Sequence, residues 1–86
     1  MIIESIKNLL KNSLSLKKVK VKGDNYYIEI IAIDDIFQNK SEVEKQKMIY
    51  SKLMDYISNK TIHSVSIKTY SLKEWENNKK LLLKNQ

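Results

Sequence analysis

The sequence predicts an α+β domain in the order α-β-β-α-β-α, with a three-stranded mixed sheet and helices on one face. Three observations lead to this prediction. Two segments of alternating or β-branched residues flank the only glycine, Gly23, and predict an antiparallel hairpin. A long helical segment separates this hairpin from a third alternating segment, and such a crossover permits parallel pairing. Two S-x-x-E patterns mark the starts of the last two helices.

The first half of the chain is expected to form a helix and the hairpin. Apolar residues recur at helical spacing over about residues 2–13. Val19 and Val21 then alternate with lysines, which is typical of a half-buried strand. The lysines of its solvent face are Lys18, Lys20 and Lys22. Residues 23–25 favour a turn, and residues 26–33 are rich in β-branched and aromatic side chains, as in a second strand.

The middle of the chain is expected to hold a short connection and the main helix. Residues 34–40 suit a connection with one helical turn, in which Asn39 tolerates a left-handed backbone. Ser41 and Glu44 have the spacing of a capping box, which predicts a helix from there to about residue 59. Its buried face is predicted to consist of Val43, Gln46, Tyr50, Leu53, Met54 and Ile57.

The C-terminal part is expected to form a strand and a last helix. Residues 64–70 alternate as a strand, and Ser71 with Glu74 forms a second capping box. Tyr70 and Trp75 have the spacing of a hydrophobic staple, which fixes the angle at which the helix leaves the strand. The predicted apolar stripe of this helix is Leu72, Trp75, Lys79 and Leu82. Residues 81–86 are expected to fray.

Composition limits the possible functions. The chain has 86 residues, which suits one domain over 1–86, and it contains one histidine and no cysteine. It therefore cannot form a disulfide scaffold, nor assemble alone a transition-metal site, which usually needs about four ligands. No apolar run approaches the roughly 20 residues of a membrane span, and none resembles a signal sequence. We expect a protein of the cytoplasm, or of an organelle matrix after processing.

The charge has two interpretations. The formal net charge is +6, and all 16 basic residues are lysine. A basic domain is compatible with nucleic-acid binding, here through the lysines at 18, 20 and 22. The alternative is a compositional bias, because lysine, asparagine and isoleucine are abundant whereas arginine, which binds phosphate bidentately, is absent. Asp34 and Asp35 suit the start of a helical turn, and no nucleophile–base pair is evident, so no enzyme is predicted.

Two long segments carry a family resemblance. GDNYYIEIIAIDDIFQNKSEVEKQKMIYSKL and TIHSVSIKTYSLKEW resemble the BolA family, in particular a small bacterial subgroup of it. The resemblance covers about residues 1–80 in the same element order, and Phe37, Lys40-Ser41 and the IHSVSIKTY segment are among its most specific parts. It implies a class II KH-like fold with an extra C-terminal helix, and we expect the isolated chain to be monomeric.

The resemblance also implies a function. In the family, a [2Fe-2S] cluster is bridged between the BolA protein and a monothiol glutaredoxin, whose cysteine and glutathione bind one iron. The invariant histidine of the family corresponds to His63, and its variable second ligand, His or Cys, corresponds to Tyr27 or at most to Tyr26. Lys68 and Tyr70 are the expected partner contacts. The implied role is iron–sulfur cluster trafficking and maturation, or iron and redox regulation.

Alternatives remain open for the main candidates. A lone histidine at a strand end more often hydrogen-bonds a backbone carbonyl, and Lys68 equally suits a solvated position. Strand alternation predicts that His63 shares a face with Val65 and Ile67, partly shielded at the rim of the sheet. The alternative function is a KH-like nucleic-acid-binding transcriptional regulator, although a single glycine cannot form the GXXG loop of KH domains. A purely structural interaction protein is the third possibility.

Overall fold

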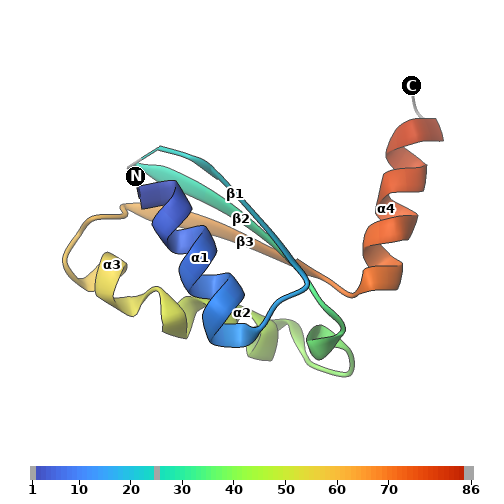
Figure 1. The fold of residues 1–86 in the computed structure, drawn as a ribbon, viewed down its shortest axis with the longest axis horizontal. Helices are drawn as coiled ribbons and strands as arrows, with labels where there is room; N and C mark the ends of the chain where they lie inside the picture. The colour runs from blue at the N-terminus through green and yellow to red at the C-terminus, as the bar shows by residue number, and fades with distance from the viewer. Residues whose placement is uncertain (1, 25, 85–86) are drawn as a thin grey trace.

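A computed structural model describes residues 2–24 and 26–84 of the chain, with side chains through residue 80. The elements in chain order are α1 (Ile2–Leu14), β1 (Lys18–Gly23), β2 (Tyr27–Ile33), the 3-10 turn η1 (Asp35–Phe37), α2 (Glu42–Lys52), α3 (Met54–Ser58), β3 (Ser64–Tyr70) and α4 (Leu72–Lys84) (Figure 1). Residue 25 of the predicted turn and residues 85 and 86 of the tail lie outside the described residues. None of the helices within the described ranges is long and apolar enough to cross a membrane.

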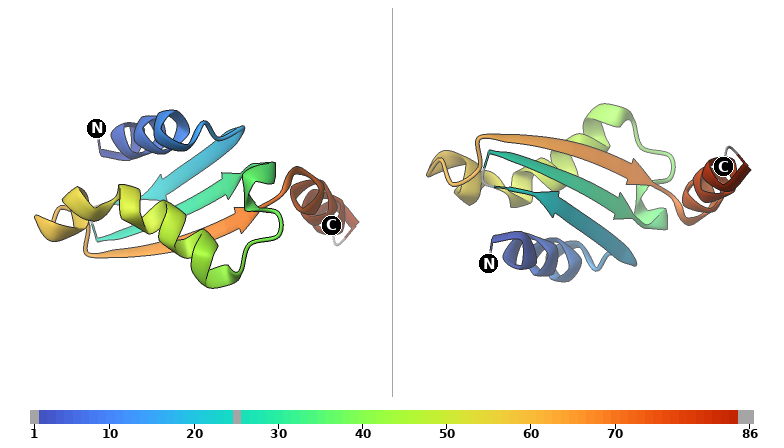
Figure 2. Two further views of the ribbon diagram at one scale, coloured as in Figure 1. Left: turned by 90° about the horizontal axis from the view of Figure 1, so that it is seen from below. Right: turned by 90° about the horizontal axis from the view of Figure 1, so that it is seen from above.

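The three strands form one mixed sheet in the order β1-β2-β3. β1 pairs with β2 antiparallel, and β2 pairs with β3 parallel. Helices α1, α2 and α3 lie on one face of this sheet, whereas α4 stands beyond the end of β3 (Figures 1 and 2). The predicted fold class is therefore confirmed.

The core lies between the sheet and helices α1 to α3. Alternate residues of β2 point into it, because successive side chains of a strand face opposite sides. The buried side chains of this cluster are Ile6, Leu10, Leu16, Val19, Ile28, Ile30, Ala32, Phe37, Ile49, Leu53 and Ile62. Phe37 comes from η1 and closes the cluster at the connection between β2 and α2.

The main helix differs from the prediction in two ways. It is interrupted at Leu53, whose backbone (φ −98°, ψ 2°) separates α2 from α3. Its buried face was predicted only in part: Leu53 is buried and Ile57 packs on the core, whereas Val43 is 61 % exposed and the completely buried Ile49 was not predicted. Tyr50 and Met54 are exposed too. The predicted face has the right period but is shifted in phase, because the helix turns Ile49, and not Tyr50, toward the sheet.

Gln46 of α2 has a role that hydrophobic periodicity does not reveal. Its side-chain amide donates a hydrogen bond to the carbonyl oxygen of Ile67, at 2.9 Å. Ile67 lies in β3, which is an edge strand, and its carbonyl has no neighbouring strand on that side. An edge strand leaves backbone groups open to pairing with other chains. Gln46 therefore covers part of this edge and ties α2 to the sheet.

Both predicted capping boxes are present. The Ser41 hydroxyl accepts from the backbone N–H of Glu44, and the Glu44 carboxylate accepts from the N–H of Ser41. Ser71 and Glu74 make the same pair of bonds at the start of α4. The hydrogen bond from the backbone of Ser41 holds the pKa of Glu44 below its ordinary value, and that from Ser71 does the same for the pKa of Glu74. Both helix starts therefore carry an ionised carboxylate.

Acidification is expected to weaken these helix starts. A carboxyl whose pKa is lowered by folding stabilises the folded state above its unfolded pKa, and this contribution is lost as the pH falls through the folded value. Glu74→Gln keeps a hydrogen-bonding side chain at the same position but does not titrate. We expect its free energy of unfolding, measured in urea across the acidic range, to depend less steeply on pH than that of the wild type. Glu76→Gln removes a carboxylate further along α4 without changing the capping box, and it is the control.

Candidate functional site

His63 lies in the connection between α3 and β3, directly before the strand begins. The preceding Ile62 is 3 % exposed and belongs to the core, whereas His63 itself is exposed. The expectation that strand alternation partly shields His63 is wrong, because alternation applies only from Ser64 onward. Ile62 takes the inward position, and the imidazole of His63 is left at the surface.

The ring of His63 stacks on the ring of Tyr26. The two ring centroids are 5.0 Å apart, and the planes are inclined by 22°. Tyr26 is 72 % exposed, so the pair forms a small aromatic surface rather than part of the core. Within the described residues, neither ring nitrogen of His63 takes part in a hydrogen bond. No group of the described residues therefore competes for these nitrogens with a ligand from outside the chain.

Tyr27 occupies a different place from Tyr26. It is the first residue of β2, is 49 % exposed, and pairs in register with Ser64 of β3. Of the two tyrosines at the predicted second-ligand position, the ring in contact with His63 is that of Tyr26. Sequence spacing alone does not separate these neighbours, because the hairpin turn decides which ring reaches the start of β3.

The backbone of Tyr26 is held from two sides. Its N–H donates to the Asp24 carboxylate at 2.9 Å, and its carbonyl accepts from both the N–H and the hydroxyl of Ser64, each at 2.9 Å. Gly23 begins this turn at φ +123°, where a Cβ atom would meet the carbonyl oxygen of Tyr27. The position therefore requires glycine. The turn and the start of β3 together determine where the Tyr26 ring lies.

The donor set near His63 suits a shared metal site only. Among the described residues, no three His, Cys, Asp or Glu side chains gather in a way that could hold a metal ion. Each iron of a [2Fe-2S] cluster takes two ligands besides the bridging sulfides, usually thiolate or imidazole. This chain offers one uncommitted imidazole at an exposed edge, and that fits a cluster whose other ligands come from a partner.

The face of the sheet opposite helices α1 to α3 is called the open face here (Figure 2). It carries both the lysines of β1 and the predicted partner contacts Lys68 and Tyr70. Residues paired in register share a face, so this face contains the strand positions Lys18, Lys20, Lys22, Glu29, Ile31, Lys68 and Tyr70. The Glu29 carboxylate lies 3.6 Å from the Lys22 ammonium and 3.9 Å from that of Lys68. Glu29 was not predicted from the sequence, and it neutralises part of a face that otherwise carries four lysines.

Trp75 closes one end of this open face. Its ring is 8 % exposed and lies 5.3 Å from the ring of Tyr70, which confirms the predicted staple. The Lys20 ammonium lies 5.0 Å from the Trp75 centroid, and that of Lys79 lies 5.9 Å away. Cations over an indole face are attracted by its electron density. Lys20 and Tyr70 thus help to attach α4 to the sheet.

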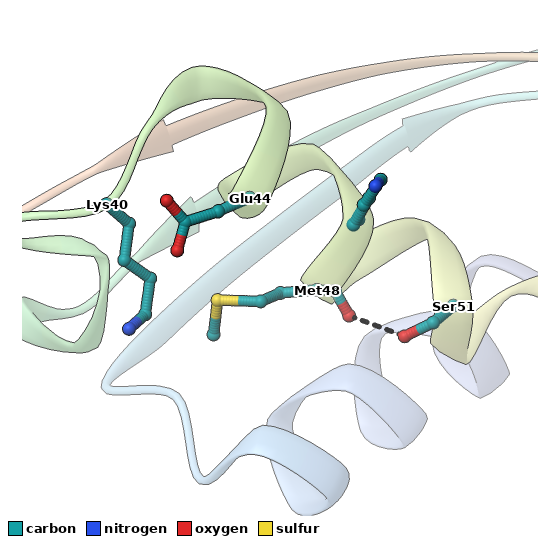
Figure 3. A pocket seen from close by; sticks show the side chains of 5 residues that line it. Lys40, Glu44, Met48 and Ser51 are labelled. Carbon is teal, nitrogen blue, oxygen red and sulfur yellow. Dashed lines mark hydrogen bonds between the residues drawn. The ribbon is translucent and has the colours of Figure 1, made fainter.

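A shallow cavity lies on α2, away from the connection that carries His63. Its volume is about 480 Å³, and its lining residues are Lys40, Glu44, Lys47, Met48 and Ser51 (Figure 3). The Ser51 hydroxyl is already bound to the carbonyl oxygen of Met48, and Glu44 caps its own helix. Two of its lining side chains therefore already bond within or at the start of α2. The cavity is separate from the candidate site at His63.

Comparison with known proteins agrees with this architecture. Residues 7–74 match the family model described as BolA-like protein. A protein of Buchnera aphidicola (subspecies Baizongia pistaciae) is 51 % identical over 88 % of this chain and 96 % of its own length. The acid stress protein IbaG of Escherichia coli is 43 % identical over 88 % of this chain and 90 % of its own.

The fold comparison extends this likeness to a solved structure. The solution structure of mouse BolA1 superposes with a TM-score of 0.79, covering 90 % of this chain and 70 % of that one. At 14 % identity this likeness concerns the fold alone. The family match and the 43 % identity to IbaG cover most of the sequence. This chain belongs to the BolA family.

Proposed function

We propose that this protein is an iron–sulfur accessory protein that binds a monothiol glutaredoxin and supplies His63 as one ligand of a bridged [2Fe-2S] cluster. It acts as an adaptor in cluster trafficking or in iron and redox regulation, and not as an enzyme. The cluster is cargo shared with the partner and with glutathione. An imidazole in place of a thiolate raises the reduction potential of such a cluster.

The observation that carries the proposal is the state of His63. Its ring is exposed at the end of the sheet, and within the described part of the chain both ring nitrogens lack hydrogen bonds. A histidine that stabilised this strand end would donate a ring N–H to a carbonyl oxygen of the chain. The absence of such a bond in the described residues favours a role in binding over a role in folding.

Anaerobic reconstitution with a monothiol glutaredoxin and glutathione tests the proposal. We expect the mixture to show a visible circular dichroism spectrum that differs from that of the glutaredoxin homodimer. Diethyl pyrocarbonate gives a second readout, because His63 is the only imidazole in the chain. We expect the reagent to modify His63 rapidly in the free protein and slowly in the cluster-bridged complex. An unchanged homodimer spectrum together with an unprotected His63 would contradict the proposal.

Lys68 and Tyr70 are the proposed partner contacts on the open face. Lys68 is the better candidate, because its side chain is 56 % exposed whereas the Tyr70 ring also packs on Trp75. Exposed charges at an interface change affinity modestly, so Lys68→Gln is expected to weaken apo-glutaredoxin binding by up to about fivefold. Lys11→Gln on α1 removes the same charge from the helical side and should leave the affinity unchanged. If Lys68→Gln and Lys11→Gln bound apo-glutaredoxin with equal affinity, Lys68 would not be an interface residue.

The lysines of β1 on the open face favour nucleic-acid binding as the second candidate function. Lys18, Lys20 and Lys22 project from one face of β1, and phosphate contacts of this kind depend strongly on salt. However, Glu29 lies within the face, and Lys20 is engaged with Trp75. We therefore expect only weak oligonucleotide binding that disappears as salt is raised. A salt-resistant, sequence-selective complex that the triple lysine-to-glutamine variant loses would place this function first.

A further inference from the structure

The orientation of His63 depends on an unusual neighbour. A histidine that binds metal generally donates its second ring N–H to a carboxylate or carbonyl, and this bond fixes the orientation of the ring. Within the described residues, His63 has no such bond, and its ring stacks on that of Tyr26. The group that contacts the His63 ring and can orient it is therefore the ring of Tyr26, in place of a hydrogen-bond acceptor.

The geometry of the stack suits this function. The two planes are inclined by only 22° at a centroid distance of 5.0 Å, so the rings lie nearly parallel. The donor lone pair of a neutral imidazole and its N–H bond both lie in the plane of the ring, whereas the tyrosine covers one of its faces. The contact therefore restricts tilting of the His63 ring and leaves both nitrogens open. A hydrogen bond would occupy one of them.

Tyr26 is itself fixed before any partner binds. Its backbone accepts two hydrogen bonds from Ser64, the residue after His63, and donates one to Asp24 in the hairpin turn. The Tyr26 ring and the His63 imidazole are therefore both fixed at the start of β3. A rigid support of this kind reduces the ordering that binding would otherwise require.

We propose that Tyr26 is the positioning residue of His63, holding the imidazole by ring stacking in the orientation in which it meets the shared cluster. This inference rests on the proposed function, because it concerns the same ligand. It assigns the tyrosine at this turn a support role and not that of a second metal ligand. It also assigns the role to Tyr26 and not to Tyr27, which lies one residue later in β2.

Three variants separate the possibilities. Tyr26→Phe keeps the ring and removes the hydroxyl, Tyr26→Leu removes the ring, and Tyr27→Leu is the matched control at the neighbouring exposed tyrosine. Proton NMR of the free protein reads the stack directly, because the sole imidazole gives only two ring CH signals. Nuclear Overhauser contacts between these signals and the residue 26 ring are expected in the wild type, in Tyr26→Phe and in Tyr27→Leu. In Tyr26→Leu the ring-current shifts of the two signals should disappear.

The complex with glutaredoxin provides the second readout. In Tyr26→Leu, the rate of cluster loss from the reconstituted complex should rise about two- to tenfold, the range that a stacked pair supplies. The affinity for apo-glutaredoxin should stay the same. Tyr26→Phe and Tyr27→Leu should both behave as the wild type in these measurements.

Several results would overturn the inference. Cluster loss at the wild-type rate in Tyr26→Leu would exclude a positioning role, and an effect of Tyr27→Leu alone would move the role to Tyr27. A defect in Tyr26→Phe equal to that in Tyr26→Leu would show that the hydroxyl acts, as a ligand or hydrogen-bonding group. A wild-type complex that forms no heteromeric cluster would overturn the proposed function and this inference with it. The first three outcomes leave the proposed function standing.

Discussion

Replacing His63 by alanine is expected to abolish the visible circular dichroism spectrum of the cluster shared with a monothiol glutaredoxin. The imidazole is the one soft nitrogen donor of the chain, which contains no cysteine. Removing it leaves an iron with oxygen ligands or water, which iron–sulfur clusters disfavour. We expect the spectrum of the mixture to revert to that of the glutaredoxin homodimer.

The same substitution should leave folding and apo-partner binding unchanged. His63 is exposed and makes no hydrogen bond within the described residues, so its loss removes the stack on Tyr26 and little else. Surface substitutions of this kind usually change the free energy of unfolding by less than about 0.5 kcal/mol. The urea midpoint and the calorimetric affinity for the apo-partner are therefore the two controls.

His63→Cys distinguishes ligation from a steric effect. A thiolate is a stronger donor to iron than imidazole and adds a negative charge, so the cluster should form but with a lower reduction potential. Retention of the wild-type spectrum by His63→Ala would disprove the ligand assignment. Failure of both variants to keep the apo-partner would instead show that His63 is an interface residue.

The parts of the fold that depend on local chemistry were predictable from the sequence. Both helix starts follow from serine and glutamate three positions apart, because a capping box is closed by residues within one turn. The left-handed backbone of Asn39 (φ +64°) was also predicted, because asparagine tolerates this conformation. The long crossover through α2 permits parallel pairing of β3 with one strand of the hairpin, and in the structure that strand is β2.

The phase of α2 was not predictable in this way. Tyr50 fits a helical stripe with Leu53 as well as Ile49 does, and only the position of the sheet decides which of the two stripes is buried. The Lys45 side chain is only 12 % exposed and Gln46 is part-buried, so polar residues also lie on shielded positions of α2 and weaken the apolar pattern. Tertiary packing therefore selects one of two stripes that periodicity leaves equivalent.

The arrangement around His63 could not be predicted from the sequence. His63 could be singled out as the sole imidazole, yet its direction depends on where strand alternation begins, which is one residue later at Ser64. The pairing of His63 with Tyr26 depends on a hairpin turn 37 positions earlier and on hydrogen bonds from Ser64 to that turn. A contact between segments so far apart follows from the register of β2 and β3, which the sequence alone does not specify.

Phe37→Ala is expected to cause the largest loss of stability in this protein. Phe37 is 1 % exposed, lies in the core cluster and is among the largest fully buried side chains of the described residues. Truncating a buried phenylalanine costs about 3–5 kcal/mol, the sum of lost burial and of the cavity left behind. Natural domains have only about 0.05–0.15 kcal/mol of stability per residue, so a chain of 86 residues loses a large part of its total.

Urea unfolding measures this effect, and Ile36→Ala provides the matched control. Ile36 precedes Phe37 in the same turn but is 40 % exposed, so its truncation should lower the free energy of unfolding by about 1 kcal/mol or less. A loss in Phe37→Ala no larger than this would show that the core collapses around the missing ring. The folded fraction of Phe37→Ala should still bind glutaredoxin with wild-type affinity, because Phe37 lies in the core and His63 at the surface. A weaker complex per folded molecule would mean that the connection after β2 also shapes the partner surface, and the family resemblance at Phe37 would then reflect recognition as well as packing.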